Sequence, residues 1–115
     1  MLTLEKLKEF GADTAEGMGR CMNNEAFYLR MVNMALDDGV FERMRTAVED
    51  GSVKEIFEAA HAMKGMLGNL SLTPLVMLSS EMTELARAGK EADYAALWDE
   101  IRTQREKLLR LRDEA

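Results

Sequence analysis

One segment, residues 53–70, constrains the fold more than any other part of the chain. Its apolar residues recur at alternating spacings of four and three, at Ile56, Ala60, Met63, Leu67 and Leu70. This spacing places them along one narrow stripe of a helix, which is typical of a helix that packs lengthwise against its neighbours in a bundle. We therefore expect residues 53–70 to form a helix with one buried face and one face in solvent.

Start and stop signals divide the rest of the chain into further helices. Glycines or polar clusters end the apolar stretches, and residues that cap helix N-termini precede them, namely Thr3, Asp13, Asn23 or Asn24, Ser52, Thr73 and Asp93. We expect short N-terminal helices within residues 3–22 and a bundle core over about 25–113.

The segment 25–50 has two interpretations. Its apolar side chains keep a helical spacing, but Asp37, Asp38 and Gly39 interrupt it. We expect one bent helix here, with two separate helices as the alternative. In either case the sequence predicts an all-α fold: a single domain over 1–115 that is an antiparallel four-helix bundle with short N-terminal helices.

The composition narrows the range of partners and compartments. The formal net charge is −6, and an acidic surface repels phosphate backbones and anionic lipids, so we expect neither nucleic acid nor a membrane as partner. Cys21 is the only cysteine, and a free thiol fits a reducing compartment, so we expect a cytoplasmic protein. The N-terminus has no apolar run of the kind that signal peptides need. A bundle with its own complete core is expected to be a monomer.

The chain has one histidine, His61, and it lies within the helix expected over 53–70. With Ile56 at zero and about 100° of turn per residue, the apolar stripe stays within about 40° of zero, whereas His61 lies near 140°. The imidazole is therefore expected on the outer face of the helix and not in the core.

Two glycines flank the histidine on that face. Gly65 and Gly68 fall at about 180° and 120°, and Lys64 and Lys54 fall at about 80° and 160°. A glycine inside a helix costs roughly 0.5–1 kcal/mol relative to alanine, so two of them on one exposed face have no stabilising purpose. Their effect is to remove side-chain bulk so that another molecule can reach the ring. Lys64 brings a mobile cation to any anion that the imidazole carries.

An exposed imidazole with a cleared approach and a nearby cation suits phosphoryl transfer. A neutral imidazole is a good nucleophile near neutral pH. Phosphoryl transfer depends mostly on in-line positioning and on neutralisation of charge. A partner that carries a metal ion and an acyl phosphate could dock over the glycines and pass its phosphoryl group to His61.

The segment 61–65, His-Ala-Met-Lys-Gly, followed by Gly68, resembles the H-x-x-K-G motif of histidine-containing phosphotransfer (HPt) domains. The resemblance extends from about Gly11 to the C-terminus. Two positions depart from the family pattern, since Met66 stands where a small residue is usual and Ser71 stands where a glycine is common. Neither departure removes an atom that the chemistry needs.

This resemblance implies a phosphorelay intermediate of two-component signalling. His61 would accept a phosphoryl group from a histidine kinase or a receiver-domain aspartate and pass it to a response-regulator aspartate, while Lys64 supports the phosphoryl charge. The chain would be a phosphoryl carrier and not an enzyme, because the kinase and the receiver domain supply the catalytic metal and acid groups. We expect no cofactor and no metal site. The implied docking surface comprises Gly65, Gly68, Phe57, Lys54 and, from the facing helix, Thr83.

Other functions have weaker support in the sequence. A zinc site is not expected, because one cysteine and one histidine cannot supply its ligands. Glu58 could orient His61, but no serine or cysteine nucleophile lies in register for a catalytic dyad. The main alternative is a binding module that docks on a histidine kinase or receiver domain and inhibits it without carrying phosphate.

The methionine content is high, at ten residues. Methionine is flexible and fills irregular gaps in apolar cores, and it also occurs on binding surfaces that adapt to several partners. We interpret these residues as core filler and not as a binding surface.

Overall fold

The computed structural model describes residues 1–114, and every regular element in that range is a helix. The helices are α1 (Leu4–Phe10), α2 (Thr14–Arg20), α3 (Glu25–Leu36), α4 (Val40–Asp50), α5 (Val53–Asn69), α6 (Thr73–Arg87) and α7 (Tyr94–Asp113). The expected all-α fold is confirmed. None of the helices among the described residues has the length and apolar character needed to cross a membrane.

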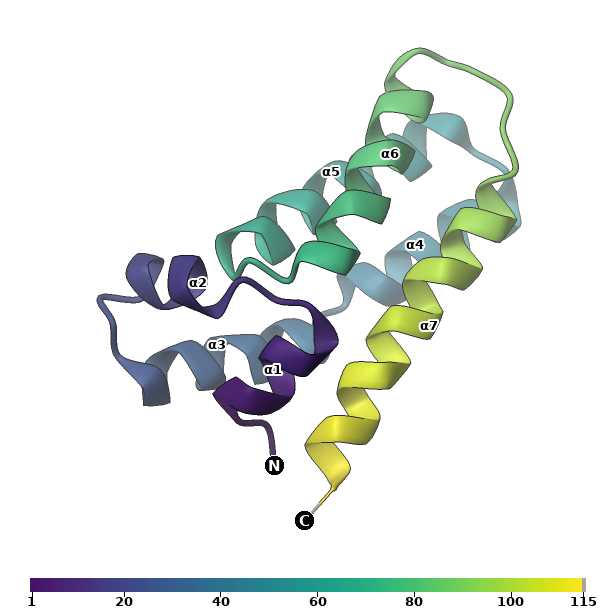
Figure 1. Ribbon diagram of the computed structural model, residues 1–115. Helices are drawn as coiled ribbons and strands as arrows, with labels where there is room; N and C mark the ends of the chain where they lie inside the picture. The colour runs from purple at the N-terminus through teal and green to yellow at the C-terminus, as the bar shows by residue number, and fades with distance from the viewer. Residues whose placement is uncertain (115) are drawn as a thin grey trace.

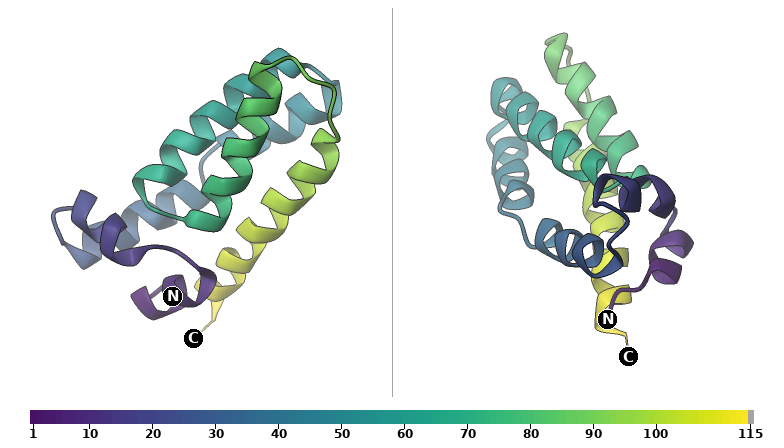
Figure 2. Two further views of the ribbon diagram at one scale, coloured as in Figure 1. Left: turned by 45° about the horizontal axis from the view of Figure 1, so that its top comes forward. Right: turned by 90° about the vertical axis from the view of Figure 1, so that its left-hand side faces the viewer.

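Four of the helices form an antiparallel bundle, as the sequence predicted. α4 packs against α5, α5 against α6 and α6 against α7, and α7 returns to contact α4 (Figure 1). The pairing of α5 with α6 is the most extensive of these interfaces. The helices α1, α2 and α3 gather at one end of the bundle, on the side where α7 ends (Figure 2).

The helices begin close to where the capping signals predicted. In five of them the capping side chain accepts a hydrogen bond from the backbone N–H three residues further on, and these caps are Thr3, Asp13, Asn24, Ser52 and Asp93. The exception is α6, where Thr73 is the first helical residue and Leu72 takes the N-cap position without a side-chain bond. Pro74 lies in the first turn of α6, where its missing N–H has no partner to lose.

Residues 25–50 form two helices, so the prediction of one bent helix is wrong and its alternative is correct. The chain changes direction between α3 and α4 (Figure 2). Arg105 of α7 donates two hydrogen bonds to the carbonyl oxygen of Leu36, at 2.9 and 2.6 Å. Arg112 donates two more to the carboxylate of Asp37, and these bonds are the main reason that the pKa of Asp37 lies below its ordinary value. Two arginines of α7 thus hold the end of α3.

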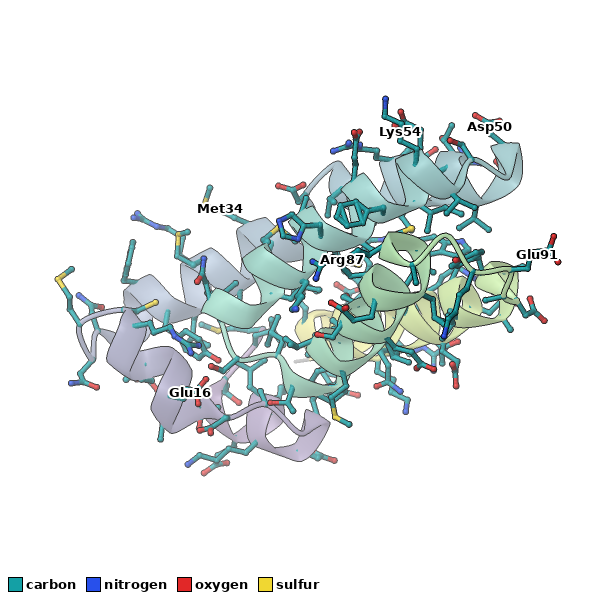
Figure 3. All side chains as sticks on the ribbon, turned by 90° about the horizontal axis from the view of Figure 1, so that it is seen from above. Glu16, Met34, Asp50, Lys54, Arg87 and Glu91 are labelled. Carbon is teal, nitrogen blue, oxygen red and sulfur yellow. The ribbon has the colours of Figure 1, made fainter. Side chains whose placement is uncertain are left out.

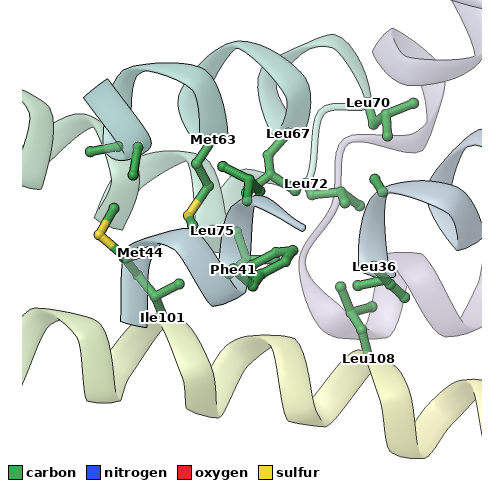
Figure 4. Close-up of a cluster of buried hydrophobic side chains, with 14 of the residues drawn as sticks. Leu36, Phe41, Met44, Met63, Leu67, Leu70, Leu72, Leu75, Ile101 and Leu108 are labelled. Atoms are coloured by element: carbon green, nitrogen blue, oxygen red, sulfur yellow. The ribbon is translucent and has the colours of Figure 1, made fainter. Parts of the chain in front are cut away.

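The apolar core lies between the bundle helices (Figure 4). The stripe predicted for α5 is buried along its whole length, and Ile56 and Met63 are no more than 1% exposed. Fully buried side chains from the other bundle helices meet it, including Met44 of α4, Leu75 of α6 and Ile101 of α7. Because this burial fixes the rotation of α5 about its own axis, it also decides which residues α5 presents to solvent.

The N-terminal helices are fastened to the turn that follows α5. The buried hydroxyl of Tyr28 donates a hydrogen bond to the carbonyl oxygen of Leu70 at 2.8 Å. The guanidinium of Arg20 donates to the carbonyl oxygen of Gly68 at 2.6 Å and to the hydroxyl of Ser71 at 2.8 Å. Ser71 in turn donates to Glu16, which also pairs with Arg20. Both α2 and α3 are therefore tied to the end of α5.

Ser71 has a left-handed backbone, with a φ of 54°. Its N–H bonds to the carbonyl of Gly68, and the N–H of Leu72 bonds to the carbonyl of Leu67, which together form a Schellman cap. Glycine takes this conformation with less strain than other residues. The departure from the family pattern at this position is thus compensated by the two side-chain hydrogen bonds of the serine.

The methionines only partly match their interpretation as core filler. Met44, Met63 and Met82 are fully buried, as expected. The other seven are at least partly exposed, and the most exposed are Met1, Met22, Met34 and Met77. Several of these exposed residues lie on or between the N-terminal helices, away from the bundle core.

Replacing Gly17 with alanine tests the attachment of α2. An added Cβ would lie 2.6 Å from the ring of Tyr28 and 2.8 Å from the carbonyl oxygen of Leu70. We expect Gly17→Ala to lower the free energy of unfolding by about 1–3 kcal/mol, because the backbone must shift to admit the methyl group. Gly19 is the matched control, since an added Cβ there meets nothing within 4 Å. Gly19→Ala is expected to be neutral or stabilising in the same thermal or denaturant unfolding experiment.

Tyr28 makes the stability depend on pH under alkaline conditions. Burial raises its pKa from 10.0 to about 12. Between these values the unfolded chain loses the phenolic proton while the folded chain keeps it, so the free energy of unfolding falls as the pH rises, by up to about 2–3 kcal/mol. Tyr28→Phe is expected to remove this part of the decline between pH 10 and 12. Equal slopes for the two proteins in denaturant titrations would contradict the assignment.

Candidate functional site

The predicted site lies on the face of α5 opposite its buried stripe. His61 is exposed, as are Gly65 and Lys54, while Lys64 and Gly68 are half-buried. The prediction that the imidazole points outward is therefore confirmed. Figure 3 shows Lys54 and Met34 projecting from the same side of the molecule. The roles of these residues remain predictions.

An aromatic ring supports the imidazole from one turn earlier in α5. The rings of Phe57 and His61 are parallel to within 5°, and their centroids are 5.7 Å apart. The guanidinium of Arg87 in α6 lies 5.6 Å from the centroid of the Phe57 ring and pairs with Glu84 at 3.2 Å. The stack limits rotation of the imidazole, and Arg87 brings a second helix and a positive charge to this face.

The two lysines predicted for the site are available to bind an anion. Neither Lys64 nor Lys54 has an ion-pair partner among residues 1–114. By contrast, Glu58, which the sequence offered as an orienting group for His61, pairs with Arg43 of α4 at 3.2 Å. The carboxylate that lies nearest in sequence to the imidazole on this face is therefore engaged by the neighbouring helix.

The glycines of this face have no internal role in packing. An added Cβ at Gly65 or at Gly68 would meet nothing within 4 Å, and both residues lie inside α5. Alanine would therefore fit at either position and would favour the helix. This finding supports the interpretation that the glycines keep the surface clear for another molecule.

Thr83 does not lie on the surface to which the sequence assigned it. It is fully buried, and its hydroxyl donates a hydrogen bond to the carbonyl oxygen of Ser79 at 2.6 Å. Ser79 does the same to Leu75 one turn earlier, at 2.8 Å. Because its side chain faces inward and its hydroxyl is already bonded, Thr83 cannot contact a partner directly, and its expected place in the docking surface is corrected.

The charged residue that α6 does bring to this face is Arg87, which the sequence reasoning missed. It follows Thr83 by four residues and so lies on the same side of α6, one turn later. At the end of the helix the long side chain reaches out to the ring of Phe57. The four-residue step from Thr83 was the signal that could have indicated it.

The chemistry that this face offers is that of an acceptor and not of a self-sufficient catalyst. It has one nucleophilic side chain, His61, with cationic groups on α5 and α6 around it. Within the described part of the chain, no group of three or more His, Cys, Asp or Glu side chains is placed to hold a metal ion. An imidazole of this kind can take a group from an incoming molecule that brings its own electrophile.

Comparison with known proteins identifies one family. The family model of the Hpt domain matches residues 34–113, which is well over half of the chain. The match covers α4 to α7, and with them the whole of the His61 face, and it begins near the end of α3. The wider resemblance noted from Gly11 onward thus extends beyond the matched residues. No curated protein and no solved structure matches the chain significantly.

Alanine at either glycine tests whether these residues serve the fold. We expect Gly65→Ala and Gly68→Ala each to raise the free energy of unfolding by about 0.5–1 kcal/mol, because the methyl group enters open space and the unfolded chain loses freedom. Chemical denaturation of the two variants measures the change. A loss of stability in either variant would show that the glycine serves internal packing after all.

Proposed function

Because the chain belongs to the Hpt domain family, we propose that His61 is the residue that carries the phosphoryl group. Family membership establishes a phosphotransfer role in two-component signalling. The observation that supports His61 in particular is its exposure on a face that two glycines leave open. It is also the only histidine in the chain, so a phosphohistidine can form nowhere else.

The transfer needs one bond to form and one to break. The lone pair of the outer ring nitrogen, Nε2, attacks the phosphorus atom of an aspartyl phosphate on the partner. A P–N bond forms, the P–O bond to the aspartate breaks, and the aspartate leaves as a carboxylate. The reverse step returns the phosphoryl group to the aspartate of another receiver domain. A histidine kinase can take the place of the first donor.

Cations on the two helices offset the charge that the phosphoryl group adds. Lys64 lies one turn after His61 and has no competing carboxylate among the described residues. Arg87 reaches the same face over Phe57, and its pairing with Glu84 is solvent-exposed, so exchange of that partner for a phosphoryl oxygen costs little. We propose that Lys64 and Arg87 together stabilise the phosphorylated state.

The open surface explains why the carrier needs a partner. Phosphoryl transfer from an acyl phosphate is assisted by a metal ion and by acidic groups that hold it. We propose that the receiver domain supplies these groups, and that Gly65, Gly68, Phe57 and Lys54 lie under it when it docks. In this proposal the protein works as a monomer and in the cytoplasm, where kinases and receiver domains of such systems exchange phosphoryl groups.

Replacing His61 with glutamine tests the assignment of the carrier residue. We expect the wild-type protein to take up label from a phosphorylated receiver domain or a kinase, in a form that acid hydrolyses and base does not. His61→Gln is expected to take up none, while its circular dichroism and unfolding midpoint stay close to those of the wild type, because the side chain lies in solvent.

The same experiment separates the proposed carrier from an inhibitory binding module. Uptake of acid-labile label by His61→Gln would mean that the assigned residue is wrong. Tight binding of a kinase or receiver domain by both proteins, with no label on either, would instead favour a module that docks without carrying phosphate.

A further inference from the structure

An apolar groove runs beside the His61 face. It has a volume of about 230 Å³ and is formed where α3 and the connection to α4 lie against the C-terminal half of α5. Three methionines line it: Met31 and Met34 from α3, and Met66 from α5. Met34 is 59% exposed and is seen in Figure 3 at the edge of the molecule. This exposure is unusual for a large apolar side chain and needs an explanation.

The groove lies within reach of any protein that docks over His61. A standard interface covers about 800 Å² on each partner, which corresponds to a disc with a radius of roughly 16 Å. Met66 follows His61 by five residues, so it lies only about 7.5 Å further along the axis of α5. A partner centred on the imidazole therefore covers the groove as well as the glycines.

The size and lining of the groove suit protein side chains better than a small molecule. Pockets for drug-sized ligands usually have 300–1,000 Å³, as a rough range, and this groove is smaller. Asp38 is the only charged residue in its lining, in a chain in which 31% of residues are charged. An apolar patch beside a cationic face is complementary to a partner that has an acidic phosphoryl site with apolar side chains next to it.

Given the proposed function, we propose that this groove is a docking site for the receiver domain that exchanges its phosphoryl group with His61. Apolar side chains of the receiver surface enter between Met34 and Met66 while its acidic phosphoryl site lies over the imidazole. The groove contributes affinity and register, and it takes no part in the chemical step.

Methionine gives this docking site a particular property. Its side chain is unbranched and polarizable, so it can pack against surfaces of different shape at little cost. A groove lined by three methionines can therefore accept receiver domains that differ in their apolar side chains. Discrimination between partners then depends on the charges around His61 more than on the shape of the groove.

A charge placed in the groove tests the proposal. Met34→Glu puts a carboxylate at the exposed edge of the groove, and Met77→Glu is the matched control. Met77 is similarly exposed, at 67%, but it lies on α6 in a separate groove against α7. Both side chains lie largely in solvent, so both variants are expected to fold and to unfold at the midpoint of the wild type within a few degrees.

Phosphorylation without a protein partner separates the chemistry from the docking. Each protein is first labelled with phosphoramidate, a small phosphoryl donor that needs no docking surface. We expect wild type, Met34→Glu and Met77→Glu to acquire acid-labile label at equal rates. The labelled proteins are then mixed with the receiver domain, chosen from a panel, to which the wild type passes label fastest, at concentrations below saturation.

The two variants are expected to differ in the second step. Transfer from Met34→Glu should be at least tenfold slower than from the wild type, with a matching rise in the dissociation constant for the receiver, whereas Met77→Glu should stay within twofold. Equal transfer and binding by Met34→Glu and the wild type would overturn the docking proposal while leaving the carrier function intact. If the labelled wild type passes label to no receiver domain, the carrier function fails and the docking proposal fails with it.

Discussion

The burial of one stripe of α5 is the constraint on which the rest of the structure depends. Ile56, Met63 and Leu67 are each almost fully buried against the other bundle helices, and this fixes the rotation of α5. The direction of His61 then follows, because residues on one rigid helix keep their angular relation. The core and the reactive face are thus two sides of one element, and substitutions in the core reach the imidazole by turning or tilting its helix.

The helices outside the family match complete this arrangement from one end. Arg20, Ser71 and Glu16 form a hydrogen-bonded group where α2 meets the turn after α5, and Tyr28 anchors α3 at the same turn. Without these contacts the C-terminal half of α5 would lack the neighbours that hold its end. The same contacts bring α3 alongside α5, and this placement creates the groove beside the acceptor face.

Sequence reasoning reached the parts of this structure that local signals determine. Caps such as Ser52 and Asp93 act on their own helix within three residues, and the apolar spacing of α5 is equally local. It was wrong about the segment 25–50, where Arg105, far away in the sequence, binds the end of α3. It also misplaced Thr83 and missed Arg87, because the relative position of two helices decides which residue of α6 reaches the ring on α5.

The parallel stack of Phe57 on His61 has an entropic consequence. A free surface histidine samples several rotamers, and a partner that captures it must hold it in one of them. Ordering a side chain at an interface costs roughly 0.5–1.5 kcal/mol, and here folding has already met most of that cost. The saving corresponds to a gain of roughly two- to tenfold in the rate of a productive encounter. Carriers of this kind exchange their cargo through brief contacts, and an acceptor ring that is already aligned shortens the search in each of them.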